Sequence, residues 1–94
     1  MYRNDSLAPI SAASAAFAAA AEDTIGGRIS FARDATGLSV AHLSAVVGVT
    51  ERTWKNWEAD RAEPRANRLD MLARVLGVNI TWLISGVGPE PRFH

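Results

Sequence analysis

The stretch Leu38–Glu58, LSVAHLSAVVGVTERTWKNWE, decides the fold of this chain because it predicts two short helices joined by a tight turn. Ser39 is a good N-cap residue, since its side-chain oxygen can accept hydrogen bonds from the unpaired N–H groups at the start of a helix. A first helix is therefore predicted over Val40–Val47. Gly48 ends it, because glycine adopts a positive φ without a Cβ penalty.

The residues after Gly48 predict a second helix. Thr50 can cap this helix as Ser39 caps the first, and residues 51–59 contain neither Gly nor Pro. The turn between the helices is then only Gly48–Thr50. Apolar side chains fall on one side of the pair, and this inward face is expected to comprise Leu43, Val46, Val47, Val49, Trp54 and Trp57. The polar side chains left on the outer face of the second helix belong to Glu51, Arg52, Lys55 and Asn56.

A short helix, a tight turn with glycine and a second helix with an exposed polar face are typical of the helix-turn-helix of DNA-binding proteins. Residues 24–89 resemble the lambda-repressor-like, Cro/Xre-type helix-turn-helix domains. The matching residues cover about two thirds of the chain and are Ile25, Arg28, Ile29, Arg33, Gly37, Leu38, Ser39, Leu43, Gly48, Val49, Thr50, Trp57, Glu58, Pro64, Leu69, Leu72, Ala73, Leu76, Gly77, Val78, Trp82, Leu83 and Gly86. The resemblance implies a compact all-α domain of five helices over residues 24–88.

The flanking sequence supplies the other three helices. Thr24 can cap a helix that runs to Thr36. Pro64 sets the start of a helix over residues 65–76, whose inward side chains are expected to be Ala66, Leu69, Leu72, Ala73 and Leu76. Asn79 can cap a last helix over residues 80–85, which Trp82 and Leu83 should pack onto the preceding helix. Residues 89–94 then form an irregular tail.

The composition excludes several classes of protein. Ninety-four residues with 48% hydrophobic side chains suit one small domain, and the lack of cysteine excludes disulfides, thiolate metal sites and cysteine nucleophiles. This composition fits the reducing cytoplasm, and no stretch approaches the roughly 20 apolar residues of a membrane span. Ten Lys and Arg balance ten Asp and Glu, so DNA affinity must come from a local basic surface. No cofactor or metal site is predicted.

Residues 1–23 differ from the rest because alanine dominates them. Alanine favours an added helix over residues 12–21, but such a segment buries little by itself, so an irregular arm is the alternative. Phe31 falls on a face where relatives carry charged residues. We therefore expect either that the arm folds back and places Phe17 near Phe31, or that Phe31 is a singly exposed aromatic residue.

The resemblance places base contacts on the second motif helix. Arg52 matches a position that touches bases in relatives, and an arginine can bind O6 and N7 of guanine together. Glu51 can accept from cytosine N4 or simply complement the helix dipole. Lys55 can reach guanine or phosphate, and Asn56 can bridge N6 and N7 of adenine. The alternative for each is a solvated polar residue.

Phosphate contacts are expected around the same helix. Arg61 and Arg65 flank the loop where family members often meet the sugar-phosphate backbone, although loop solubility would also explain them. Further candidates for backbone contact are Ser39, His42, Thr50 and Thr53, followed by Arg28 and Arg68. Val40, Asp60 and Glu63 depart from the family pattern, because relatives carry a glutamine, a glycine and a commonly basic loop there. Each departure weakens the expected attraction to phosphate.

Other motif residues are expected to build the scaffold. Arg33 and Glu58 match a structural ion pair of the family, so removal of either should leave a partly buried charge. Trp54 and Trp57 could form a stacking platform for single strands, but their positions match the family core. The core of the motif is thus expected to contain Leu43, Val47, Gly48, Val49, Trp54 and Trp57. A homodimer is expected through Ile80, Ile84 and Val87, because this end of the domain often forms the dimer seam in relatives.

The sequence therefore predicts a sequence-specific regulator of transcription that inserts the helix over residues 51–59 into the major groove of double-stranded DNA as a dimer. One alternative is an antitoxin-type autoregulator that also binds a partner protein, through the N-terminal arm or the tail. The other is a protein-interaction module that has lost DNA binding. Catalysis is not expected, since His42 and His94 lack partners for acid–base or nucleophilic chemistry, and Gly26-Gly27 follows no strand.

Overall fold

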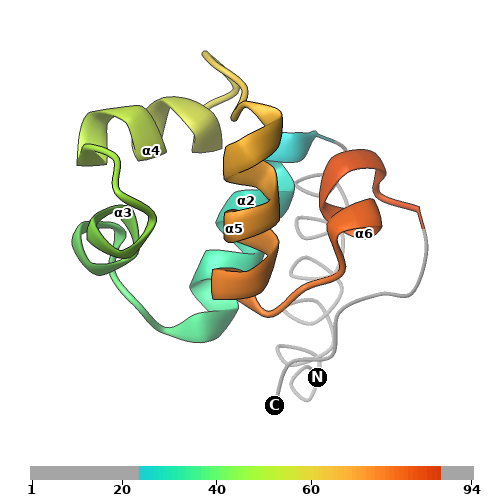
Figure 1. The fold of residues 1–94 in the computed structure, drawn as a ribbon, viewed down its shortest axis with the longest axis horizontal. Helices are drawn as coiled ribbons and strands as arrows, with labels where there is room; N and C mark the ends of the chain where they lie inside the picture. The colour runs from blue at the N-terminus through green and yellow to red at the C-terminus, as the bar shows by residue number, and fades with distance from the viewer. Residues whose placement is uncertain (1–23, 88–94) are drawn as a thin grey trace, which may run out of the picture.

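The computed structural model describes residues 24–87, which form five helices and no β-strand. The all-α prediction is therefore confirmed. The helices are α2 (Ile25–Thr36), α3 (Val40–Val47), α4 (Glu51–Glu58), α5 (Ala66–Leu76) and α6 (Ile80–Ser85). In Figure 1, α5 crosses in front of α2, with α3 and α4 on one side of this pair and α6 on the other. The predicted arm over residues 1–23, the contact of Phe17 and the tail over residues 89–94 lie outside the described residues.

The helix ends are formed by the capping residues that the sequence predicts. The side-chain oxygens of Thr24, Ser39 and Thr50 accept hydrogen bonds from backbone N–H groups three residues ahead, at 2.9, 3.0 and 3.1 Å. Asn79 caps α6 in a similar way. Gly48 ends α3 with φ of 90°, a left-handed conformation that glycine adopts without strain. The helices α4 and α5 are each one residue shorter than predicted, ending at Glu58 and beginning at Ala66.

The core lies where α2 meets the other helices. Its largest fully buried side chains come from every helix and are Ile29, Leu43, Trp54, Leu72, Trp82 and Leu83. The helix α2 contacts α4, α5 and α6, while α3 packs against α4 and α5. Trp82 and Leu83 bury α6 against both α5 and α2, which confirms the predicted packing of the last helix and adds α2 as a second partner.

Two of the predicted inward residues are wrong. Val46 is 50% exposed, and Ala66 is exposed at the first position of α5. In α3 the buried side is formed by Leu43, Ser44 and Val47. Because successive residues of an α-helix are turned by about 100°, residue 46 lies nearly opposite residue 44 and faces solvent. The buried side of α3 therefore includes the small Ser44 and leaves Val46 outside.

Phe31 is half-buried, and its ring lies 6.5 Å from that of Trp82 between centroids. The two rings are tilted by 56°, an arrangement in the range that aromatic pairs prefer. The alternative prediction that Phe31 is a singly exposed aromatic residue is thus wrong, because Trp82 of α6 packs against its ring.

Gly26 allows α2 to approach the end of α4 very closely. A Cβ atom at this position would lie 2.3 Å from the backbone oxygen of Trp57 and 2.5 Å from a carboxylate oxygen of Asp60. Gly26 is also buried. Since a backbone oxygen cannot rotate away as a side chain can, any larger residue must separate the two helices.

We predict that Gly26→Ala lowers the free energy of unfolding by about 1–3 kcal/mol, the usual cost of overpacking a core. The exposed Ala35→Gly substitution is the matched control, because it measures the Gly/Ala difference in the same helix at about 1 kcal/mol. Without a clash, alanine at position 26 should stabilise the protein by roughly that amount. Urea unfolding followed by circular dichroism distinguishes the two signs, and a stabilised Gly26→Ala variant would contradict the close approach.

Candidate nucleic-acid interface

The helix α4 has two chemically distinct faces. The inward face carries Trp54 and Trp57, which are buried and whose rings lie 5.8 Å apart between centroids. This burial excludes the stacking platform that the tryptophans could otherwise form and confirms their predicted place in the core. Leu43 and Val47 of α3 are buried beside them in the same core, and Val49 of the turn is partly buried against it. The prediction that Gly48 belongs to this core is wrong, because Gly48 is exposed at the end of α3.

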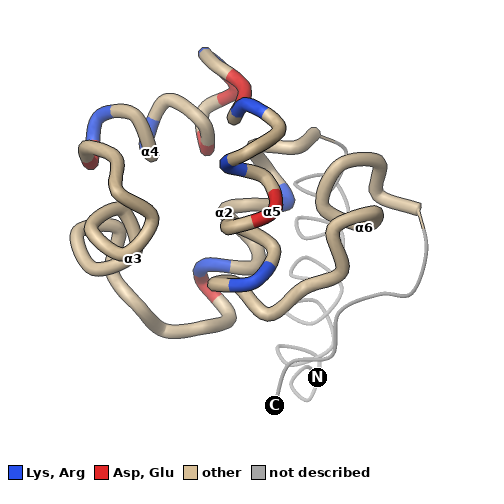
Figure 2. The backbone as a smooth tube through the Cα atoms, viewed as in Figure 1, with Lys and Arg blue, Asp and Glu red and all other residues tan. Residues whose placement is uncertain are grey.

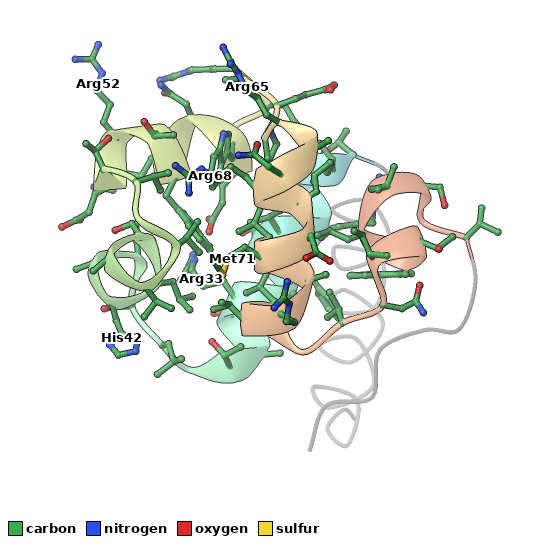
Figure 3. The ribbon with its side chains drawn as sticks, viewed as in Figure 1. Arg33, His42, Arg52, Arg65, Arg68 and Met71 are labelled. Carbon is green, nitrogen blue, oxygen red and sulfur yellow. The ribbon has the colours of Figure 1, made fainter. Side chains whose placement is uncertain are left out.

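The outward face of α4 carries the residues predicted to contact bases. Glu51, Arg52 and Lys55 are exposed, whereas Asn56 is half-buried. Arg52 projects away from the body of the molecule, at the same edge as Arg65 from the start of α5 (Figure 3). The arrangement thus brings together an exposed polar helix and a cation from the segment that follows it.

A groove of about 370 Å³ separates α4 from the start of α5, and we call it the α4–α5 groove. It is lined by apolar and polar side chains from both sides, namely Val49, Thr53, Trp57, Glu63, Arg65, Asn67 and Arg68. The exposed Arg65 and the start of a helix favour an anion such as a DNA phosphate, while Glu63 opposes it. The sequence does not indicate Asn67, because only the fold brings it into one groove with Thr53.

The other phosphate candidates do not all lie on one edge. Arg61 is exposed in the loop after α4. His42 is exposed on α3 but projects from the opposite edge to Arg52 and Arg65 in this view (Figure 3). Ser39 and Thr50 use their side-chain oxygens as N-caps, and the Thr50 hydroxyl also donates to Thr53 at 3.0 Å. Capping is therefore the structural role that the structure shows for these hydroxyl groups.

Glu58, the last residue of α4, accepts hydrogen bonds from α2 and from its own helix. Arg33 donates through Nε, and through Nη2 at 3.1 Å, so the predicted ion pair is present in the structure. The indole N–H of the buried Trp54 donates to the same carboxylate at 2.6 Å. The hydrogen bond with Glu58 raises the pKa of the Arg33 guanidinium above its ordinary value, and partial burial acts in the opposite direction. The pair therefore joins α4 to α2 through charged groups.

Asp60 has a structural role that the sequence did not reveal. One carboxylate oxygen accepts from the Thr24 hydroxyl at 2.6 Å, and the other accepts from the N–H of Gly26 at 2.9 Å. Its φ of 58° is left-handed, and Asp is one of the residues that tolerate this conformation. The charge of Asp60 is thus directed at the positive end of α2, and its effect on phosphate attraction stays a prediction.

Arg28 is not available for the predicted contact with a DNA phosphate. Its side chain is only 5% exposed, and its guanidinium donates to the carbonyl oxygens of Leu83 and Ile84, each at 2.8 Å. These carbonyls lie at the end of α6, where the helix itself provides no donors. The short last helix is thus held at its C-terminus by a cation from α2. No local sequence pattern marks this role, since the partners are backbone atoms 55 and 56 residues away.

Charged residues are unevenly distributed over the domain. Figure 2 shows them on α2, α4, α5 and the loop between α4 and α5, whereas α3 and α6 carry none. Within residues 24–87 no three His, Asp or Glu side chains gather closely enough to hold a metal ion. No helix of this described part has the length and apolar character needed to cross a bilayer.

The comparison with protein families agrees with this geometry. A family model described as a helix-turn-helix domain matches residues 26–89, which cover the five described helices except Ile25, the first residue of α2. Searches of curated proteins and of solved structures found no significant match.

The Arg33–Glu58 pair should contribute measurably to stability. We predict that Arg33→Met lowers the free energy of unfolding by about 2 kcal/mol. This is less than for a fully buried pair, because the two side chains remain 23% and 15% exposed. The exposed Asp70–Arg74 pair is the control, and Asp70→Asn should change the stability by less than about 0.5 kcal/mol. Equal effects of both substitutions in thermal unfolding would show that the Arg33 pair has no special role.

Proposed function

The chain belongs to the helix-turn-helix domain family, and from this premise we propose that it is a sequence-specific regulator of transcription that binds double-stranded DNA. One observation supports the proposal above all. The helix α4 is fixed to the core through two buried tryptophans, while its opposite face presents Glu51, Arg52 and Lys55 to solvent. A rigid helix with an exposed row of hydrogen-bonding side chains is what the major groove accepts.

The proposed mechanism is docking without chemistry. The helix α4 enters the major groove, where Arg52 donates to O6 and N7 of a guanine and Asn56 bridges an adenine. Lys55 contacts guanine or a phosphate, and Glu51 accepts from a cytosine. Arg65 and Arg61 neutralise phosphates at the edge of the groove, which fixes the register of the protein on the duplex.

We also propose that the protein binds DNA as a two-fold dimer through α6. Ile80, Ile84 and Val87 are exposed apolar residues on or just after this uncharged helix, and Val87 reaches 68% exposure. A two-fold dimer would present two copies of α4 to half-sites spaced by about 34 Å, one turn of DNA. Each operator would then have a two-fold symmetric sequence.

A protein-interaction module is the second candidate. The exposed carboxylate of Glu63 lies in the α4–α5 groove beside Arg65, and the chain has no net charge. Both features reduce the attraction to a polyanion, and this second function needs no nucleic acid. An antitoxin would combine the two functions, because it binds its own operator and a partner protein.

The decisive experiment is a selection of bound genomic fragments at two salt concentrations. A DNA-binding regulator should enrich one motif, and its affinity should fall with salt by about 0.9 log units per log unit of salt for each phosphate neutralised. If the selection enriches no motif and the binding shows no salt dependence, the protein-interaction module becomes the better proposal.

Arg52→Ala should lower the affinity for the selected operator by about 1–3 kcal/mol and relax the preference at one base position. Arg74→Ala is the control, because this exposed cation lies near the other end of α5 and pairs with Asp70. Repeating the selection with both variants tests the assignment. An unchanged motif for Arg52→Ala would rule out its contact with a base.

Ile84→Glu should convert the dimer into a monomer of 10.1 kDa, because burying a carboxylate in an apolar interface is unfavourable. The matched control is Val46→Glu, which adds the same charge at a half-exposed apolar residue of α3, on the opposite side of the domain (Figure 1). Light scattering measures both masses. A dimer that persists in Ile84→Glu, or a monomeric native protein, would show that α6 is not the interface.

A further inference from the structure

Arg68 connects α5 to the turn of the helix-turn-helix. It lies in the first turn of α5, and its Nη1 donates to the carbonyl oxygen of Val47 at 2.9 Å. Val47 is the last residue of α3 and directly precedes Gly48. In Figure 3 the half-buried Arg68 lies between α4 and α5, whereas Arg52 and Arg65 project outward. The side chain thus reaches across the domain to another helix.

The location of Arg68 is unfavourable for α5 itself. The first turn of a helix has a positive end, which anions stabilise and cations do not. The first turn of α5 has no acidic residue, and the N-cap residue Arg65 makes no side-chain capping hydrogen bond. At the C-terminus of α3 the same cation is favourable, because the carbonyl groups there carry partial negative charge and lack helical partners. The contact with Val47 therefore gives Arg68 a favourable interaction that α5 itself does not provide.

The hydrogen bond from Arg68 adds to the contacts that α3 itself makes with the turn. Within α3, the carbonyl oxygen of Ser44 accepts from the N–H groups of Gly48 and Val49, at 2.8 and 2.9 Å. Arg68 binds the carbonyl oxygen of Val47 from another helix, and its Nη1 lies 3.8 Å from where a Cβ of Gly48 would be. The helix α4 begins only three residues after Gly48, at Glu51. A shift of the turn is therefore passed directly to the start of α4.

We propose that Arg68 is a positioning residue, which fixes the turn between α3 and α4 and so sets how the first turn of α4 is presented to DNA. This role differs from the phosphate contact for which the sequence analysis names Arg68 as a candidate. The proposal rests on the proposed function, because the presentation of α4 matters only if α4 reads DNA. The hydrogen bond itself can be tested without DNA.

The binding test compares variants on the operator that the native protein selects. Arg68→Met keeps the aliphatic stem but loses the donor, and it should weaken binding about tenfold with an unchanged salt slope. Arg68→Lys keeps a cationic donor and should restore most of the affinity. Arg65→Met is the matched control, because loss of a phosphate contact lowers the salt slope by about 0.9. A similar loss of slope in Arg68→Met would show that Arg68 contacts phosphate and overturn the proposal.

The DNA-free test is amide hydrogen exchange by NMR, well below the unfolding temperature. Arg68→Met should speed exchange at the hydrogen-bonded amides of Gly48, Val49 and Thr53 relative to α2 and α6, whereas general destabilisation would speed all helices together. If the native protein selects no operator, the proposed function fails, and the exchange pattern alone then decides the role of Arg68. Unchanged or uniformly faster exchange in Arg68→Met overturns it.

Discussion

The carboxylate of Glu58 is the group on which the arrangement of the helix-turn-helix depends. It satisfies two demands at once, since the buried indole N–H of Trp54 needs an acceptor and the partly buried guanidinium of Arg33 needs a counter-ion. Because Glu58 ends α4 while Arg33 belongs to α2, a single side chain joins α4 to the centre of the domain. The contacts of Glu58 on the inner side of α4 thus help to set the orientation of its exposed face.

Further contacts fix the remaining parts of α4. Gly26 lets the backbone of α2 approach the backbone at Trp57, and Asp60 closes this junction with two hydrogen bonds. At the other end, the turn before α4 is held by Ser44 and Arg68. The helix α4 has only eight residues, and an isolated helix of this length is marginally stable. Its stability therefore depends on these tertiary contacts.

The sequence predicts well what depends on neighbouring residues. The caps at Ser39 and Thr50 and the end of α3 at Gly48 follow from local chemistry, and all three are present. The Arg33–Glu58 pair was predicted through the family resemblance. The roles of Arg28, Asp60 and Arg68 could not be predicted, because each binds backbone atoms of a distant helix, and every residue offers the same backbone groups. The DNA contacts of the outer face of α4 depend on the complex with DNA, so the assignment of contact residues remains a prediction.

The junction at Asp60 also has a consequence for the order of folding. Its hydrogen bonds join residues 34 and 36 positions apart and so close a loop that contains both α3 and α4. Most other hydrogen bonds of the domain are local to one helix or turn, and these form quickly. Closing this long loop costs more chain entropy than forming the local contacts does. We therefore expect the Asp60 junction to form in the slow, cooperative step of folding. On this expectation α4 becomes ordered together with α2, and α4 alone is not a separate folding unit.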